Sequence, residues 1–320
     1  MRYDRRCHTA TGAKEVIVER IGIAGIGRMG RAIAERIMAA GYPLTVWNRT
    51  PARAAPLRDV GAQLADSPRA LAEASDIVLT LLTNDQAIEA VYLGPDGLLS
   101  GAVEGKLFVE MSTVRTATIQ QLAAAVAQRG AALVDAPVSG TVGPARAGQL
   151  LALVGGAEAH VARVRPVLET FCRRIAYLGP SGSGTTMKLA LNLPMAVYWQ
   201  ALAEALALGQ QFGLDLASML DLIADSPAAL AALRMKIPII LGQPDEVAFD
   251  VTGVRKDLLA MIATGQQLGV PMPAASAALL SFTAATAAGL GAQDLAAMIP
   301  FYLRSVRDAT RQPPADVQRA

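Results

Sequence analysis

Lys188 and Asn192 are the residues of this sequence best suited to moving a proton. They stand four residues apart in a stretch typical of a helix, so both side chains lie on one helical face. The neighbouring residues are mostly apolar, and such a setting lowers the pKa of a lysine toward the range useful for proton transfer. An ordinary solvated helix face is the alternative interpretation. Histidine is scarce, because the chain has only His8 and His160, so a lysine or tyrosine must be considered as the proton donor.

A glycine-rich loop lies near the start of the chain. Ile21–Gly25 is typical of a strand and Ala32–Ala40 of an amphipathic helix, and a Gly-x-Gly-x-x-Gly pattern connects them. The first glycine allows a tight turn, the second lets backbone N–H groups approach a pyrophosphate, and the third permits close helix–strand packing. This context predicts a dinucleotide-binding fold. The expected cofactor-binding residues of the loop are Gly25, Gly27, Arg28, Met29 and Gly30.

The second expected strand ends in Trp47-Asn48-Arg49-Thr50. An acidic residue at this offset from the glycine loop would bind the ribose 2′-hydroxyl of NAD, whereas an arginine suits the 2′-phosphate of NADP. Arg49 can meet that phosphate with forked hydrogen bonds, and Asn48 and Thr50 add neutral donors. We therefore expect NADP(H) to be preferred over NAD(H). The alternative is that Arg49 is a solvated loop arginine.

Polar residues also follow other expected strands. Ser112 and Thr113 come after one strand, and Leu82-Thr83-Asn84 ends another. Hydroxyl groups at the carboxyl ends of parallel strands fit the crevice in which open α/β sheets bind ligands. We expect Thr113 to contact the cofactor, although threonine and asparagine are also common helix caps.

A third candidate segment runs from Asp135 to Thr141. Its sequence, Asp-Ala-Pro-Val-Ser-Gly-Thr, follows a strand end, and such a turn can direct successive N–H and hydroxyl groups at an anion. Ser139, Gly140 and Thr141 are the expected substrate-binding residues of this segment. A turn without a ligand remains the alternative.

Apolar runs and helical stretches alternate from Glu19 to Tyr177, which predicts an α/β domain with a parallel sheet. After Gly179–Gly184 the strand signals stop, and a long helix from about Thr186 to Phe212 leads into an all-α domain. We expect a Rossmann domain at 19–182 and a helical substrate and dimerisation domain at 183–312, joined by this long interdomain helix. The expected strands are Ile21–Gly25, Leu44–Trp47, Ile77–Leu82, Leu107–Glu110, Ala132–Ala136, Leu150–Val154 and Ile175–Leu178.

Composition excludes several classes of protein. Hydrophobic residues make up 52% and charged residues 18% of the 320 residues, which excludes intrinsic disorder of the whole chain. The net charge of +2 is too balanced for a nucleic-acid or membrane-surface footprint. The only cysteines, Cys7 and Cys172, have no metal-ligand spacing, so we expect no metal site and a reducing, cytoplasmic compartment.

The ends of the chain and its longest uncharged stretch favour neither a secretory signal nor a membrane span. Residues 1–18 contain no continuous apolar run and are expected to form a disordered leader rather than a secretory signal, and 313–320 a tail. The stretch from Val270 to Gln293 is diluted by serine, threonine, proline and glycine, which suits a packed helix better than a membrane span. We expect no membrane partner.

Four motifs occur in a distinctive order: Gly25–Gly30, Asp135–Gly140, Gly182–Asn192 and Lys256–Leu258. Through them the chain resembles the β-hydroxyacid dehydrogenase family, which includes 3-hydroxyisobutyrate dehydrogenases and glyoxylate/succinic semialdehyde reductases. The resemblance covers nearly all of the chain from about Ile21 onward. Thr141 stands where family members usually have a second glycine, and Pro144 where a small residue is commoner, so the substrate preference is not carried over.

The resemblance implies roles for individual residues. Lys188 would be the general acid–base, Asn192 would help orient the substrate, and Ser139 with Gly140 would hold the substrate carboxylate. Lys256 would reach the cofactor across an interdomain cleft, and Phe249 resembles a substrate-pocket aromatic of some members. Leu82 and Thr83 resemble the family segment that lies along the cofactor ribose, so both would contact the cofactor.

We therefore expect an NADP(H)-dependent oxidoreductase that moves a hydride between nicotinamide and a small hydroxyacid, semialdehyde or glyoxylate-type substrate. An imine reductase is one alternative, although those enzymes typically lack the lysine at position 188. A cofactor-binding module without catalysis is another, because a fold alone does not prove chemistry. The helical domain has more apolar surface than it can hide alone, which predicts a homodimer or homotetramer.

Overall fold

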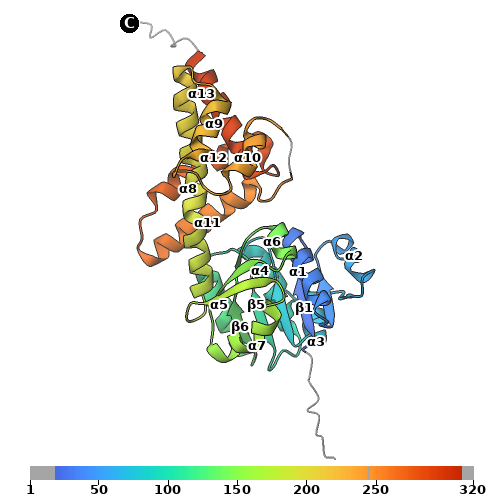
Figure 1. The fold of residues 1–320 in the computed structure, drawn as a ribbon. Coiled ribbons are helices and arrows are strands. Elements are labelled where there is room, and N and C mark those ends of the chain that lie inside the picture. The colour runs from blue at the N-terminus through green and yellow to red at the C-terminus, as the bar shows by residue number, and fades with distance from the viewer. Residues whose placement is uncertain (1–18, 244–245, 312–320) are drawn as a thin grey trace, which may run out of the picture.

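The computed structural model describes residues 19–243 and 246–311. They form two lobes, one built around a sheet and one built of helices, and the helix α8 (Ser183–Phe212) runs from the first lobe into the second (Figure 1). The expected leader 1–18 and tail 313–320 lie outside the described residues, as do Pro244 and Asp245 in the expected loop after Gly242.

The N-terminal lobe contains a six-stranded parallel sheet in the order β3-β2-β1-β4-β5-β6. Its strand order reverses between β1 and β4, and open sheets bind ligands where such a reversal occurs. The predicted Rossmann fold is confirmed. The strands are β1 (Ile21–Ala24), β2 (Leu44–Trp47), β3 (Gln63–Leu64), β4 (Ile77–Thr80), β5 (Leu107–Glu110) and β6 (Ala132–Asp135).

Helices cover both faces of this sheet. The central strands β1, β4 and β5 are buried at every position, which is why they read as continuous apolar runs rather than as alternating ones. Ile23 and Val109 pack in one core layer and Val78 and Phe108 in the other. The helices of this lobe are α1 (Arg28–Ala39), α2 (Ala55–Arg58), α3 (Pro68–Ala74), α4 (Asp85–Leu93), α5 (Thr116–Gln128), α6 (Val142–Arg146) and α7 (Glu158–Leu168), with 3₁₀ turns at Pro51–Arg53 and Leu98–Ser100.

A second sheet of three strands lies beside the first, in the order β7-β8-β9. Its strands are β7 (Val138–Ser139), β8 (Leu150–Val154) and β9 (Cys172–Tyr177), so the last two expected strands exist but do not extend the large sheet. β7 pairs antiparallel with β8, and only the short α6 separates them. A parallel pairing would need a longer crossover connection.

The C-terminal lobe is helical, as predicted, and packs around α8. Trp199 of α8 and Phe282 of α12 are fully buried in its core. α8 begins at Ser183, three residues before the expected start, and ends at Phe212, followed by the C-cap Gly213, whose φ of 101° favours glycine. The other elements are α9 (Leu216–Asp225), α10 (Leu233–Ile240), α11 (Val251–Leu268), α12 (Pro273–Ala285), a π-helical turn (Thr286–Leu290), a 3₁₀ turn (Leu295–Ala297) and α13 (Met298–Arg311).

The apolar stretch Pro273–Leu290 is long enough to span a membrane by length and composition alone. Within it, Ala278, Phe282 and Ala285 are fully buried in the helical core, but only 22% of the stretch is buried, which is less than the sequence led us to expect of a packed helix. The stretch also breaks at Gly289, where φ is 86°. Such a helix is weak support for a membrane span.

Candidate active site

The glycine loop forms a cradle at the amino end of α1. A Cβ atom at Gly25 would lie 2.2 Å from the carbonyl oxygen of Leu81, and one at Gly30 would lie 2.0 Å from that of Gly25, so neither position tolerates a side chain. A Cβ atom at Gly27 would meet no atom within 4 Å. No side chain caps α1, and its first turn has no acidic residue. The open space over Gly27 and the uncapped N–H groups fit the pyrophosphate of a dinucleotide.

Asn48 holds this cradle in place. Its Oδ1 accepts a hydrogen bond from the N–H of Ile26 at 2.9 Å, and its Nδ2 donates to the carbonyl oxygen of Thr50 at 2.8 Å. The structure therefore gives Asn48 a positioning contact that the sequence did not predict.

Arg49 is exposed and forms no hydrogen bond or ion pair with any described residue. The same holds for Arg53 in the 3₁₀ turn that follows β2. Sequence reasoning missed Arg53, although an arginine four residues after Arg49 at the end of the same strand was a visible signal. Both guanidinium groups are available for an anion.

Arg28, the expected cofactor-binding arginine of the glycine loop, contacts the helical lobe. Its guanidinium donates to the carbonyl oxygen of Val247 and, at 3.1 Å, to Oδ2 of Asp250. Asp250 also caps α11 by accepting from the N–H of Gly253 at 2.7 Å. Arg28 thus ties the glycine loop to the start of α11. Met29, next to it, packs against the core of the sheet.

The loops after β4 and β5 are joined to each other. The N–H of Leu82 donates to Oγ of Ser112 at 2.7 Å, while Thr83 is exposed. Asn84 caps α4, which agrees with its alternative interpretation as a helix cap. Thr113 is not the cap of α5, because Arg115 occupies that position. The carbonyl oxygen of Thr113 instead accepts a hydrogen bond from the Lys256 ammonium of α11 at 2.5 Å.

Asp135 fixes the start of α8. Its two carboxylate oxygens accept hydrogen bonds from the N–H groups of Gly182 and Thr185, each at 2.8 Å. The side chain is fully buried, and burial raises the pKa of this carboxyl. Because Thr185 lies three residues before Lys188 and Asp135 four before Ser139, these hydrogen bonds link the two segments expected to act on the substrate.

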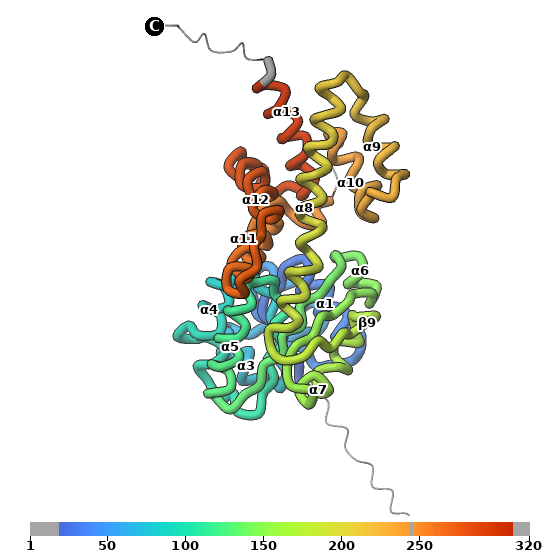
Figure 2. Tube along the Cα trace, turned by 90° about the vertical axis from the view of Figure 1, so that its left-hand side faces the viewer, coloured from blue at the N-terminus to red at the C-terminus, as the bar shows by residue number. Residues whose placement is uncertain are grey.

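Four polar side chains meet where α8 passes α11. Nδ2 of Asn192 donates to Oδ2 of Asp257 at 2.9 Å, and Nζ of Lys256 lies 2.6 Å from Oδ1 of Asp257. Lys188 interacts electrostatically with Asp257 and Lys256. α11 also contacts α5 through Thr264 and Thr116, so this cluster lies at the junction of the lobes (Figure 2).

Lys188 is half-buried and forms no hydrogen bond with any described residue. Burial lowers the pKa of its ammonium, the charge of Asp257 opposes that shift, and the charge of Lys256 adds to it. A lysine whose pKa is lowered in this way releases its proton more readily than a solvated one.

Asp257, which is 3% exposed, is a member of the cluster that sequence reasoning did not select. The available signal was its place in a helix of mainly apolar residues, where an acidic residue needs partners.

The expected substrate-binding residues lie on two elements. Ser139 is half-buried on β7, and Gly140 and Thr141 follow it, exposed, with φ of 128° at Gly140. The side chains of Ser139 and Thr141 form no hydrogen bond with any described residue. Phe249 packs against the core of the helical lobe just before α11.

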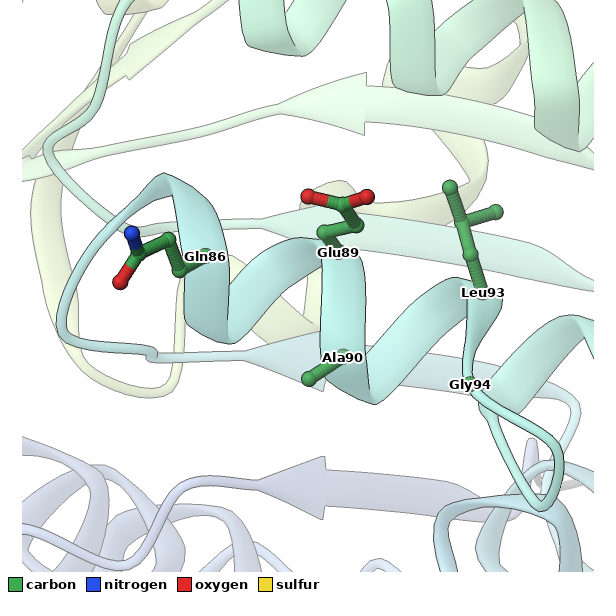
Figure 3. Close-up of a pocket in the computed structure, with 5 residues that line it drawn as sticks. All are labelled: Gln86, Glu89, Ala90, Leu93 and Gly94. Atoms are coloured by element: carbon green, nitrogen blue, oxygen red, sulfur yellow. The ribbon is translucent and has the colours of Figure 1, made fainter.

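A shallow depression elsewhere on the surface does not belong to this site. It lies on the outer side of α4 and is lined by Gln86, Glu89, Ala90, Leu93 and Gly94. Glu89 and Leu93 point away from the helix in the same direction (Figure 3). None of the cluster residues lines it.

Two family models match consecutive parts of the chain. Residues 20–179 match the NAD binding domain of 6-phosphogluconate dehydrogenase, and residues 182–302 match a domain described as NAD-binding of NADP-dependent 3-hydroxyisobutyrate dehydrogenase. A 3-hydroxyisobutyrate dehydrogenase of Pseudomonas aeruginosa is 36% identical over 273 residues, covering 82% of this chain and 92% of that protein. The chain belongs to the β-hydroxyacid dehydrogenase family.

Further relatives agree with this membership. Glyoxylate/succinic semialdehyde reductase 1 of Arabidopsis thaliana is 32% identical over 279 residues, covering 87% of this chain and 96% of the reductase. The crystal structure of a 3-hydroxyisobutyrate dehydrogenase from Salmonella typhimurium has a TM-score of 0.78 and 30% identity, covering 88% of this chain and 99% of that one. The family membership predicted from the four motifs is confirmed, and with it an oxidoreductase that binds a nicotinamide cofactor.

Proposed function

We propose that this β-hydroxyacid dehydrogenase interconverts the hydroxyl and carbonyl forms of a small carboxylate with NADP(H), and that Lys188 is its general acid–base. The observation that carries the proposal is the half-buried Lys188 ammonium, which has no hydrogen-bond partner among the described residues and lies in the Asn192–Asp257–Lys256 cluster. A group without a protein partner is available to a substrate hydroxyl.

The bound nicotinamide supplies or accepts a hydride, and the protein handles the proton. In the reducing direction the Lys188 ammonium donates a proton to the oxygen that gains charge as the carbonyl is reduced. In the oxidising direction the neutral amine removes it. Asp257 keeps the pKa of Lys188 from falling as far as burial alone would lower it. Asn192, held by Asp257, orients the substrate oxygen.

The substrate class follows from the anion-binding turn and the relatives. Ser139, Gly140 and Thr141 offer hydroxyl and N–H groups to a carboxylate, and Phe249 supplies an apolar wall. The relatives are named for 3-hydroxyisobutyrate, glyoxylate and succinic semialdehyde. We infer that substrates come from this group or are close analogues such as tartronate semialdehyde.

The preference for NADP(H) rests on the end of β2. Arg49 and Arg53 are exposed guanidinium groups without protein partners among the described residues, and Thr50 adds a hydroxyl. A 2′-phosphate would satisfy them, whereas NAD(H) would leave them solvated. Wild-type kcat/KM should favour NADPH over NADH. Arg49→Ala should lower kcat/KM with NADPH by about tenfold or more and leave the value with NADH nearly unchanged.

The oligomeric state we infer is a homodimer or homotetramer. Large apolar side chains are exposed on the helical lobe, with Phe212 87%, Leu208 77% and Leu222 71% exposed. Burying such a surface against a second copy would stabilise the protein. Light scattering of the wild type and of Phe212→Glu tests this inference, since a monomeric wild type would contradict it.

We also propose a cytoplasmic location, because the described free thiol of Cys172 is buried and suits a reducing compartment. Fractionation of the source cells would test this proposal.

The deciding experiment is a substrate screen with both nicotinamides. Semialdehydes, glyoxylate and 3-hydroxyisobutyrate are compared with cyclic imines while NADPH consumption is followed. Turnover of carboxylate substrates that disappears in Lys188→Ala supports the proposal. Turnover of imines alone would favour an imine reductase, and cofactor binding with no turnover would favour a binding module.

A further inference from the structure

A carboxylate that takes no part in the proposed chemistry lies under the two cofactor loops. Glu110, the last residue of β5, has no exposed surface. Its Oε2 accepts a hydrogen bond from Oγ1 of Thr80 at 2.5 Å, and its Oε1 accepts one from the N–H of Ser112 at 2.7 Å. Oγ of Ser112 in turn accepts a hydrogen bond from the N–H of Leu82. One chain of hydrogen bonds therefore runs from Glu110 to both loops.

The surroundings of Glu110 make this arrangement costly. Val109 and Phe108, which precede it, are fully buried, and an ionised carboxylate in such a core is disfavoured unless hydrogen bonds hold it. Burial raises the pKa of Glu110 to about 7, although the hydrogen bonds from Ser112 and Thr80 oppose the shift. Both of its protonation states are accessible near neutral pH.

We propose that Glu110 is a positioning residue for cofactor binding: its ionised carboxylate orients Ser112, which holds the Leu82 loop in the conformation that binds the nicotinamide end of the cofactor. This inference rests on the proposed role of Leu82, Thr83 and Thr113 in the cofactor site.

The hydrogen bond from the Ser112 N–H to Glu110 differs in strength between the two protonation states of Glu110. An ionised Glu110 accepts from both Thr80 and Ser112, and each hydrogen bond is strengthened by the charge. A protonated Glu110 must donate to Thr80, whose own hydroxyl then turns to Tyr92 or to the carbonyl oxygen of Val109. The Ser112 N–H keeps only a neutral acceptor. Its loop is held more weakly, and the affinity for the cofactor falls with it.

Few other ionisable groups face this network. Tyr92 of α4 hydrogen-bonds to Thr80 and lowers the pKa of Glu110. Burial raises the pKa of Tyr92 well above its usual range, so it stays neutral. Asp135, the register partner of Glu110 on β6, directs both oxygens at the start of α8. The two loops also meet through Asp85 and Arg115, and hydrogen bonds keep the pKa of Asp85 below its usual value. Lys256 of α11 binds the carbonyl oxygen of Thr113.

The test is the pH dependence of cofactor binding, measured without substrate by NADPH fluorescence between pH 5.5 and 8.5. For the wild type we expect Kd to rise by about three- to tenfold as the pH falls through 7. Part of any rise comes from the cofactor, whose 2′-phosphate titrates near pH 6. Glu110→Gln keeps the shape and removes the ionisation, so its Kd should stay near the acidic value of the wild type and follow only the cofactor.

Tyr92→Phe is the matched control. It removes a hydroxyl that interacts with Thr80 and Glu110 and leaves Ser112 in place. Because that hydroxyl lowers the pKa of Glu110, the Kd of the variant should keep a pH dependence that is moved to higher pH, while its melting temperature falls. If Glu110→Gln and the wild type have the same pH dependence, or if Tyr92→Phe loses it equally, the proposal is overturned. A wild type that binds no NADPH at any pH would instead overturn the proposed cofactor and this inference with it.

A second variant guards against misfolding of Glu110→Gln. Ser112→Ala removes the acceptor of the Leu82 N–H while leaving Glu110 in place, and it should weaken NADPH binding by about three- to tenfold. If Glu110 acts through Ser112, adding Glu110→Gln to Ser112→Ala should change Kd by less than about twofold. Independent, additive effects of the two substitutions would contradict the positioning role.

Discussion

The two lobes contribute to the site in different ways. At the glycine loop the groups offered to the cofactor are backbone N–H groups, and the requirement on the sequence is that side chains be absent. At the start of α8 and on α11 the groups are the side chains of Lys188, Asn192 and Asp257, and the charge of Asp257 acts on the pKa of Lys188. A change in the first region should therefore act through shape, and a change in the second through charge.

The largest effect should come from the charged region. Lys188→Ala removes the proton donor, and kcat for carbonyl reduction should fall by roughly a hundredfold or more. The Kd for NADPH should change by less than about twofold, because Lys188 lies outside the glycine cradle. Steady-state kinetics and fluorescence titration measure the two quantities. Lys188→Arg is the control for charge alone and should remain inactive, since a guanidinium does not give up its proton in proteins. Near-normal turnover in either variant would remove Lys188 from the mechanism.

The glycine loop should give the second-largest effect, and two substitutions of the same size separate its two functions. Gly27→Ala places a methyl group in open space, so the melting temperature without cofactor should hardly change, whereas NADPH binding should weaken by about tenfold or more. Gly30→Ala places its methyl group 2.0 Å from the carbonyl oxygen of Gly25, so the fold itself should lose stability. Thermal unfolding and NADPH titration distinguish the two outcomes. Equal behaviour of the two variants would mean that the loop is not shaped for a ligand.

A third prediction concerns the direction of a pH shift. Carbonyl reduction needs protonated Lys188, so its rate falls as the pH rises through the pKa of that group. Asp257→Asn removes a charge that raises this pKa, and the fall in rate should move to lower pH. Lys256→Gln removes a charge that lowers it, and the fall should move the other way. Profiles of kcat at saturating cofactor would show both shifts. Shifts of the same sign would disprove the charge coupling.

This contrast between the lobes also explains how far the sequence could be read. The glycine loop is local, so Gly25 to Gly30 and the residues beside them sufficed to predict the first strand and the first helix, while the alternation of apolar runs and helical stretches predicted the parallel sheet. Two short strands, β3 and β7, escaped prediction because two residues carry no periodic signal. The separate small sheet was missed for a related reason: Leu150–Val154 shows that a strand exists but not which strand it pairs with.

The site was harder to predict where it depends on distant pairs. Lys188 and Asn192 were found because they share one helix, but Asp257 lies 65 positions from Asn192. The contact between Arg28 and Asp250 spans 222 positions. No local pattern records such pairings, since they arise only when α11 packs at the junction of the lobes. Arg28 was accordingly expected at the cofactor, and its bond to the helical lobe came as new information from the structure.

The smallest expected effect concerns stability. Burial lowers the pKa of Lys188 in the folded protein, whereas in the unfolded chain the pKa returns to its usual range. Because the unfolded chain binds this proton more tightly than the folded protein does, the ionised lysine lowers the free energy of unfolding at neutral pH. This loss of stability disappears as the pH rises from the folded-state pKa to the unfolded-state pKa. Lys188→Met should therefore abolish turnover and yet raise the free energy of unfolding by about 1 kcal/mol at pH 7.

Lys106 provides the matched control for that last prediction. Its ammonium is also partly buried, but it donates to the carbonyl oxygen of Ser75 at 2.6 Å, so Lys106→Met should lose stability rather than gain it. Chemical denaturation at pH 7 and at pH 10 measures both variants, and the gain for Lys188→Met should shrink at the higher pH. A loss of stability in Lys188→Met would mean that the amine is satisfied in the folded protein. The amine would then not be available to a substrate. The contrast between a glycine loop that acts through shape and a Lys188 region that acts through charge would be lost.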